Sequence, residues 1–132
     1  MDQGVLVSGE LSSGADLAQK LGMKWPVRAA FWLRKSDEDR GYLYIAIEGF
    51  AGASSFPVYN DVNRIARESS YPNFDHFRVN LIDANESMAR AAIELNLRYP
   101  DPLGHRTGPK MFGDIFAEDL YVYPLPLPAA VG

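Results

Sequence analysis

Residues 31–50, FWLRKSDEDRGYLYIAIEGF, decide the fold because they predict two strands joined by a charged turn. Apolar side chains recur at every second position of residues 27–34 and again of residues 42–48. This period of two is typical of strands with one buried face. Residues 35–41 between them are charged and end in glycine, as a hairpin turn does. We therefore expect a β-hairpin at the centre of the domain.

Opposite charges favour one register for this hairpin. Pairing Arg28 with Glu48 also places Trp32 opposite Tyr44 and Leu33 opposite Leu43. Such a charge pair contributes about 0.2–1 kcal/mol across two strands. A slip by two residues would set Trp32 against Tyr42 and lose the charge pair, so we prefer the first register.

Helical and extended patterns alternate on either side of the hairpin. Ser12 or Ser13 can cap a helix that ends at Gly22, and Ser55 can cap another that carries apolar residues to position 66. Residues 83–86 can open a third helix that Pro100 stops. Strands are expected at residues 76–82 and 120–123, and a weaker one at residues 5–7. The order is α-β-β-α-β-α-β.

This order predicts a single α+β domain of two layers. We expect a mainly antiparallel or mixed sheet of about four strands, with helices on one face. The domain spans residues 1–123, of which residues 1–11 are loose or form a short strand. Residues 124–132 form a proline-rich extended tail, since alternating prolines cannot join a central strand.

The register gives the predicted sheet two unlike faces. One is almost purely apolar and matches the apolar stripes of the helices. The other is rich in aromatic rings and arginines, which are enriched at protein interfaces. We interpret it as an uncovered binding face, although the rings could equally serve only to stabilise the strands. The predicted binding face contains Arg28, Trp32, Arg34, Tyr42, Tyr44, Tyr121 and Tyr123.

Composition excludes several classes of protein. The chain has 132 residues, a net charge of −4 and no cysteine, so disulfides and cysteine-based metal sites are ruled out. With only His76 and His105 as histidines, we expect no metal and no cofactor. No apolar run reaches the roughly 20 residues that span a bilayer. Without a basic, apolar leader at the N-terminus we expect a cytoplasmic protein and no membrane partner.

Three residues assigned to the aromatic face are weak candidates for catalysis. Glu48, His76 and Arg78 are the base, acid and phosphate-binding group that RNA cleavage through the ribose 2′-hydroxyl would need. Glu48 already has a candidate partner in Arg28. A histidine at the start of a strand is also more often a solvated residue than a catalyst.

Residues 100–119 show no convincing helix or strand pattern, and we expect a loop there. A loop of this length is unusual in a compact domain. The stretch GHRTGPK within it lacks the spacing of a phosphate-binding loop. His105, Arg106 and Lys110 could still gather an anion if the loop folds over the aromatic face. Asp37, Glu38 and Asp39 in the hairpin turn lack the ligand spacing of a calcium loop, and we expect a solvated tip there.

Two functions remain open. The first is a non-enzymatic module that binds another protein or a second copy of itself through the aromatic face. The alternative is a nucleic-acid- or nucleotide-binding protein, or a small ribonuclease-like enzyme, that uses the same face and the 100–119 loop. The negative net charge disfavours nucleic acid as the partner.

Overall fold

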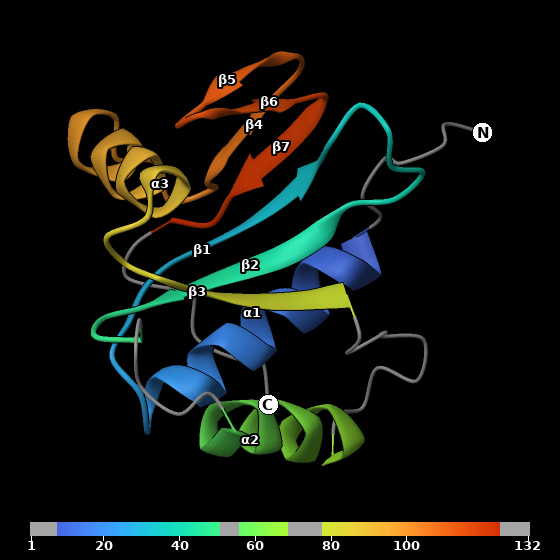
Figure 1. Ribbon diagram of the computed structural model, residues 1–132, viewed down its shortest axis with the longest axis vertical. Helices are drawn as coiled ribbons and strands as arrows, with labels where there is room; N and C mark the ends of the chain where they lie inside the picture. The colour runs from blue at the N-terminus through green and yellow to red at the C-terminus, as the bar shows by residue number, and fades with distance from the viewer. Residues whose placement is uncertain (1–7, 51–55, 69–77, 125–132) are drawn as a thin grey trace.

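The computed structural model describes residues 8–50, 56–68 and 78–124 (Figure 1). Helices and strands follow one another in the order α1, β1, β2, α2, β3, α3, β4, β5, β6, β7. Their bounds are α1 Ser8–Gly22, β1 Val27–Arg34, β2 Tyr42–Ile47, α2 Phe56–Glu68, β3 Val79–Asp83, α3 Ser87–Arg98, β4 His105–Thr107, β5 Lys110–Phe112, β6 Ile115–Ala117 and β7 Asp119–Val122. The predicted order of the larger elements is confirmed.

The main sheet has five strands in the order β3-β2-β1-β7-β4, and β5 with β6 forms a separate two-stranded sheet. β1 lies between β2 and β7 and is antiparallel to both, whereas β2 and β3 are parallel. The parallel pair is joined through α2, as a strand–helix–strand connection requires. The predicted α+β class and mixed sheet are therefore confirmed.

Helices cover both faces of this sheet, which differs from the prediction of helices on one face. Figure 1 shows α1 and α2 on one side and α3 on the other. Leu17, Val62 and their neighbours on α1 and α2 pack in one core with Trp32 and Leu43. Met88, Ala89 and Ala92 of α3 pack in a second core with Phe31 and Val122. Both strands of the hairpin are therefore buried on both faces, whereas the sequence predicted one buried face.

The register of β1 and β2 explains this error. Leu33 is opposite Tyr42, Phe31 opposite Tyr44, and Trp32 opposite Leu43, one residue away from the register predicted from charge. Because side chains alternate between faces, a slip by one residue exchanges the faces of a whole strand. Trp32 therefore shares a face with Leu43, and not with Tyr44.

The predicted contact between Arg28 and Glu48 nevertheless forms, with 3.3 Å between Nη1 and Oε1. An irregularity of the pairing between Val27 and Ala29 shifts the strand there, so the two charged residues meet at its end. The contact was predicted correctly, but it does not fix the register of the strands.

Residues 100–119 differ most from the prediction, since they contain β4, β5 and β6 in place of a loop. The hairpin of β5 and β6 packs on the α3 side of the sheet, where the ring of Phe112 meets that of Phe31 edge-on with 5.2 Å between centroids. It therefore does not cover the face that carries Trp32. The predicted strand at residues 5–7, His76 and the tail beyond residue 124 lie outside the described residues.

Gly14 marks the closest approach of α1 to the sheet. A Cβ added at Gly14 would lie within contact distance of the Tyr123 hydroxyl and 2.9 Å from Trp32 Nε1. Both atoms belong to buried, hydrogen-bonded side chains that cannot move aside easily. Only glycine allows α1 to lie this close to β1 and β7.

We expect Gly14→Ala to lower the free energy of unfolding by about 1–3 kcal/mol, as overpacking does, although alanine favours a helix. Gly108→Ala is the matched control, because a Cβ there would meet nothing within 4 Å. Urea unfolding of both variants measures the difference. A Gly14→Ala protein as stable as the wild type would show that the helix does not depend on this contact.

Candidate functional site

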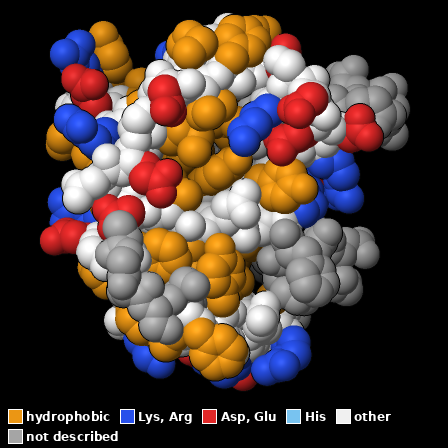
Figure 2. All heavy atoms as spheres, viewed as in Figure 1, with side chains coloured by type: hydrophobic (Ala, Val, Ile, Leu, Met, Phe, Trp, Pro, Cys, Tyr) orange, Lys and Arg blue, Asp and Glu red, His pale blue; other side chains and the backbone are white. Residues whose placement is uncertain are grey.

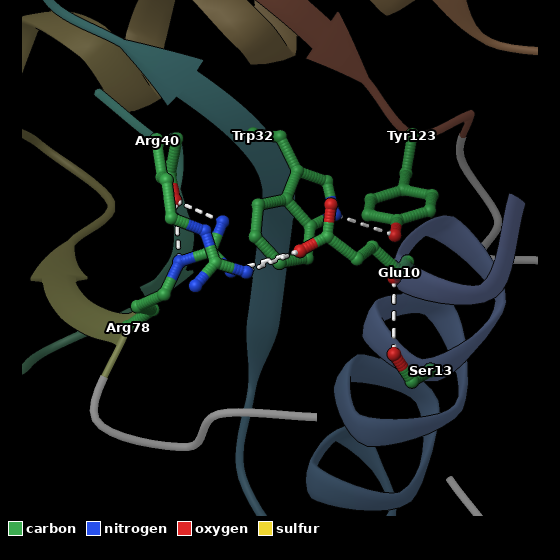
Figure 3. Close-up of polar contacts among 7 residues, drawn as sticks. Glu10, Ser13, Trp32, Arg40, Arg78 and Tyr123 are labelled. Carbon is green, nitrogen blue, oxygen red and sulfur yellow. Dashed lines mark hydrogen bonds and ion pairs between the residues drawn. The ribbon is translucent and has the colours of Figure 1, made fainter. Parts of the chain in front are cut away.

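Trp32, the centre of the predicted binding face, is 1 % exposed and lies within the core beneath α1. Its Nε1 donates a hydrogen bond to the Tyr123 hydroxyl at 2.9 Å (Figure 3). That hydroxyl in turn donates to the Leu11 carbonyl at 2.6 Å. Burial holds the pKa of Tyr123 far above the ordinary value for tyrosine, so the hydroxyl stays protonated and can donate. The predicted exposure of Trp32 is wrong, because its single polar atom has a partner inside the protein.

Arg78 closes the same cluster from the start of β3. Its guanidinium carbon lies 5.3 Å from the centroid of the Trp32 ring, its Nη1 donates to Glu10 Oε2 at 2.8 Å, and its Nε donates to the Gly41 carbonyl at 2.9 Å. Arg40 also reaches Glu10 Oε2, at 3.4 Å. Figure 3 shows Glu10 on α1 facing both arginines beside the indole. This nearly buried cluster joins α1 to β1, to β3 and to the residue before β2.

The other rings of the predicted face are divided between the two sides of the sheet. Tyr44 is buried against Phe31, with stacked rings 5.3 Å apart, and burial raises its pKa. Tyr121 is half-buried and donates its hydroxyl hydrogen to the Leu103 carbonyl at 2.8 Å. Arg34 Nη1 donates to the Glu38 carbonyl at 3.3 Å. These residues do not form one continuous exposed surface.

The candidate catalytic residues do not converge either. Arg78 binds the carbonyl of Gly41, just before β2, whereas Glu48 follows the last residue of β2. The six residues of β2 between Gly41 and Glu48 span about 20 Å in an extended strand. Glu48 is exposed and paired with Arg28, and His76 lies outside the described residues. Glu48 and Arg78 are thus too far apart to act on one phosphate.

The three predicted anion-binding residues are separated as well. His105 and Arg106 are consecutive in β4, so their side chains point to opposite faces. The His105 ring nitrogen Nε2 lies 2.5 Å from the Tyr99 carbonyl oxygen, and Arg106 reaches Asp119 at 3.7 Å. Lys110 is exposed in β5, beside α3.

Residues of the acidic hairpin turn bind one another and Glu118. Ser36 donates to Glu118 at 2.8 Å, and the amide of Lys35 donates to Glu38 at 3.0 Å. Within residues 8–50, 56–68 and 78–124 no group of three or more histidine, aspartate or glutamate side chains could hold a metal ion.

A second polar cluster lies between α2 and the residues before β1. Trp25 Nε1 donates to Asp61 Oδ2 at 2.8 Å, and Lys24 and Arg64 form ion pairs with the same carboxylate at 3.1 and 3.4 Å. The hydrogen bond from Trp25 lowers the pKa of Asp61, and the two cations act in the same direction. All polar partners of Asp61 named here come from the chain itself, so the cluster serves to hold α2 in place.

Several of the exposed apolar side chains lie on or next to α3 and the β5–β6 hairpin. Leu97 and Tyr99 at the end of α3 are 78 % and 61 % exposed, and Met111 and Phe116 on the hairpin are 57 % and 42 % exposed. Met111 and Phe116 are opposite each other across the two strands, on the face that points away from buried Phe112. Figure 2 shows hydrophobic side chains at the top of the view, where Figure 1 draws this hairpin. We call these four residues and the groove between them the α3–hairpin surface.

Two adjoining hollows make up the groove of this surface, with volumes of about 690 and 170 Å³. Both are lined by Ala91, Glu94 and Gly113. The larger one extends to Ile93 and Leu97, and the smaller one to Tyr99 and Met111. The groove is therefore continuous along one side of α3.

A sequence pattern could have revealed the hairpin of this surface, although not its exposure. Phe112 and Ile115 flank Gly113-Asp114, a two-residue turn that predicts a hairpin. Gly113 has a φ of 63°, as expected for glycine at the first position of a type II′ turn. Leu97 is an exposed leucine on α3, and such a residue indicates a contact surface only when its neighbours in space are known.

No family model matches the chain, and no curated protein or solved structure shows significant similarity to it. Among the described residues no helix is long and apolar enough to cross a membrane. The function is therefore inferred from the surfaces of this chain alone.

We expect Glu10→Ala to lower the free energy of unfolding by about 1–3 kcal/mol, because it leaves the nearly buried Arg78 without a carboxylate. Glu68→Ala is the control, since it removes an exposed ion pair with Arg64 that is worth no more than about 0.5 kcal/mol. Urea unfolding compares the two. Equal losses in both variants would show that the Arg78 cluster contributes no more than a surface pair.

Tyr123 should make the protein less stable at high pH. In the unfolded chain its hydroxyl ionises near pH 10, whereas burial keeps it protonated in the folded protein. The folded state therefore binds more protons above about pH 10, and the free energy of unfolding falls as pH rises, by up to about 1.4 kcal/mol per pH unit from this group.

Tyr123→Phe should lower the free energy of unfolding by about 1–2 kcal/mol at neutral pH, since Trp32 Nε1 loses its acceptor. At high pH the free energy of unfolding of this variant should fall less steeply than that of the wild type. Tyr44 and Tyr121, whose pKa values are also raised, supply the slope that remains. Urea unfolding at several pH values tests this, with Tyr99→Phe as the exposed control. An unchanged alkaline slope in Tyr123→Phe would contradict it.

Proposed function

We propose that the protein is a non-enzymatic protein-binding module and that the α3–hairpin surface is its binding site. The observation that carries the proposal is the exposure of Leu97, Tyr99 and Met111 along one groove, with exposed Phe116 opposite Met111 on the hairpin. Contiguous exposed apolar surface of this kind marks interaction sites in small proteins, whereas singly exposed apolar residues do not. Met and Tyr are also among the residues enriched at interfaces.

The proposal keeps the function expected from the sequence and moves it to another surface. The aromatic face cannot serve, because Trp32 and Tyr44 are buried on opposite sides of the sheet. The same burial weakens the nucleic-acid alternative, since buried rings cannot stack on bases. Arg28, an arginine of the predicted binding face, is paired with Glu48.

The groups that line the groove favour binding over catalysis. Glu94 forms an ion pair with Arg98 at 3.2 Å, and Ser87 donates its hydroxyl hydrogen to Asp114 at 3.0 Å. A nucleophile activated by a base needs the base within hydrogen-bond reach of the nucleophile and oriented by a third group. The Ser87–Asp114 pair lacks such a third group among the residues that line the groove.

A display library of random peptides of about 16 residues, about 24 Å long as a helix, tests the proposal. We expect immobilised wild-type protein to enrich peptides that a Leu97→Asp/Met111→Asp variant does not retain, because both substitutions place a charge in the apolar groove. Unfolding curves must first show that the variant is folded.

Met23→Asp/Phe56→Asp is the matched control, since both residues are exposed apolar side chains away from α3 and the hairpin. It should retain the enriched peptides. If the library yields no peptide that distinguishes the groove variant from this control, the α3–hairpin surface is not a peptide-binding site.

A further inference from the structure

The charges around the α3–hairpin surface indicate what kind of segment it accepts. Four charged residues line the groove, namely Arg90, Glu94, Arg98 and Lys110. Glu94 is neutralised by Arg98, which leaves Arg90 and Lys110 as a positive excess. The whole chain carries a net charge of −4, so this local excess runs against the composition of the protein.

We infer that the occupant of this groove is an acidic amphipathic segment of a partner protein, an inference that rests on the proposed function. Its apolar side chains would lie along Ile93, Leu97 and Met111, and its carboxylates would face Arg90 and Lys110. A helix laid in an apolar groove is read through residues at positions i, i+3, i+4 and i+7, with charges on the flanks.

Arg90 and Lys110 are placed to flank such a segment on both sides. Arg90 lies on α3 and lines the larger hollow, whereas Lys110 lies on β5 and lines the smaller one. Both side chains are exposed. Exposed charges at the rim of an interface act mainly on partner choice and association rate, which is the property that the test should measure.

Asp114 is an acidic group beside the groove. Asp114 follows Gly113 in the hairpin turn and accepts the hydrogen bond from Ser87, at the start of α3. Because Gly113 lines both hollows, Asp114 reduces the attraction of an acidic segment without excluding it from either end of the groove.

A membrane with anionic lipids could also attract Arg90 and Lys110 together with exposed apolar side chains. We favour a peptide because the apolar side chains line a groove between α3 and the hairpin. A lipid surface is better matched by a protruding apolar face. Anionic vesicles are therefore included in the test as the competing outcome.

The test uses two capped, fluorescently labelled helical peptides of about 18 residues, a length that spans about 27 Å. Both carry leucine at positions i, i+3, i+4 and i+7 with alanine spacers, and they differ only in having glutamate or lysine at the flanking positions. Fluorescence anisotropy with the full chain gives the affinities at about 50 and about 500 mM salt. We expect the glutamate peptide to bind about tenfold more tightly at low salt, and the preference to shrink at high salt.

Arg90→Glu/Lys110→Glu should abolish or reverse this preference. Lys20→Glu/Arg67→Glu makes the same change of net charge on α1 and α2 and should preserve it. Leu97→Asp/Met111→Asp should lose both peptides, because the apolar contact is shared by them.

Each other outcome overturns a distinct claim. If both peptides bind equally to the wild type and neither binds Leu97→Asp/Met111→Asp, the groove is a protein-binding site without charge selection, so this inference fails and the proposed function stands. If neither peptide binds but the display library still enriches peptides, the partner is not an acidic helix. If vesicles with anionic lipid bind the chain and the peptides do not, the occupant is a membrane.

Discussion

The burial of β1 on both faces is the constraint on which the rest of the structure depends. Trp32 points into the core beneath α1 and α2, and its neighbour Phe31 points into the core beneath α3. Burial of each large apolar side chain contributes about 1.5–3 kcal/mol, and one of the two contributions is lost if either helix layer is missing. A central strand of this kind therefore requires helices on both sides, and the chain supplies α1 and α2 for one and α3 for the other.

The indole of Trp32 brings a polar atom into the core, and several elements are arranged around it. Tyr123, the residue after β7, accepts a hydrogen bond from the indole Nε1. Arg78, just before β3, lies over the indole ring, and Glu10 on α1 forms an ion pair with Arg78. Gly14 lets α1 approach closely enough for these contacts. Three segments that are far apart in the chain thus meet at one side chain, and each supplies a polar group that would be costly to bury alone.

Most of the fold could be predicted from local patterns. The helix signals at Gly22, Ser55 and Pro100 located α1, α2 and α3 to within a few residues, and the alternation around Phe31 located β1 and β2. The register could not be predicted from the Arg28–Glu48 pair, since that contact is worth about 0.2–1 kcal/mol and forms through a local irregularity of the strand. The several kilocalories from packing Phe31 and Trp32 into separate cores exceed it, and they depend on helix positions that no local pattern states.

The candidate site could not be predicted for a related reason. Tyrosine and tryptophan carry one polar atom each, so the sequence alone does not tell a buried ring with a partner from an exposed one. Residues 42–47 contain no charged residue, which is typical of a strand covered on both faces, but two tyrosines concealed the pattern. The exposure of Met111 and Leu97 could not be predicted, because it depends on how the β5–β6 hairpin packs against α3.

The same packing that conceals Trp32 also leaves the α3–hairpin surface exposed. Phe112 and Ala117 on the inner face of the hairpin are buried with Phe31 beneath α3, so the hairpin must turn Met111 and Phe116 outward. α3 in turn uses Met88, Ala89 and Ala92 against the sheet, which leaves Leu97 on its outer side. Exposure of these apolar side chains is thus a direct consequence of a well-packed core. The large apolar residues flanked by Arg90 and Lys110 are the surface that the proposed partner would contact.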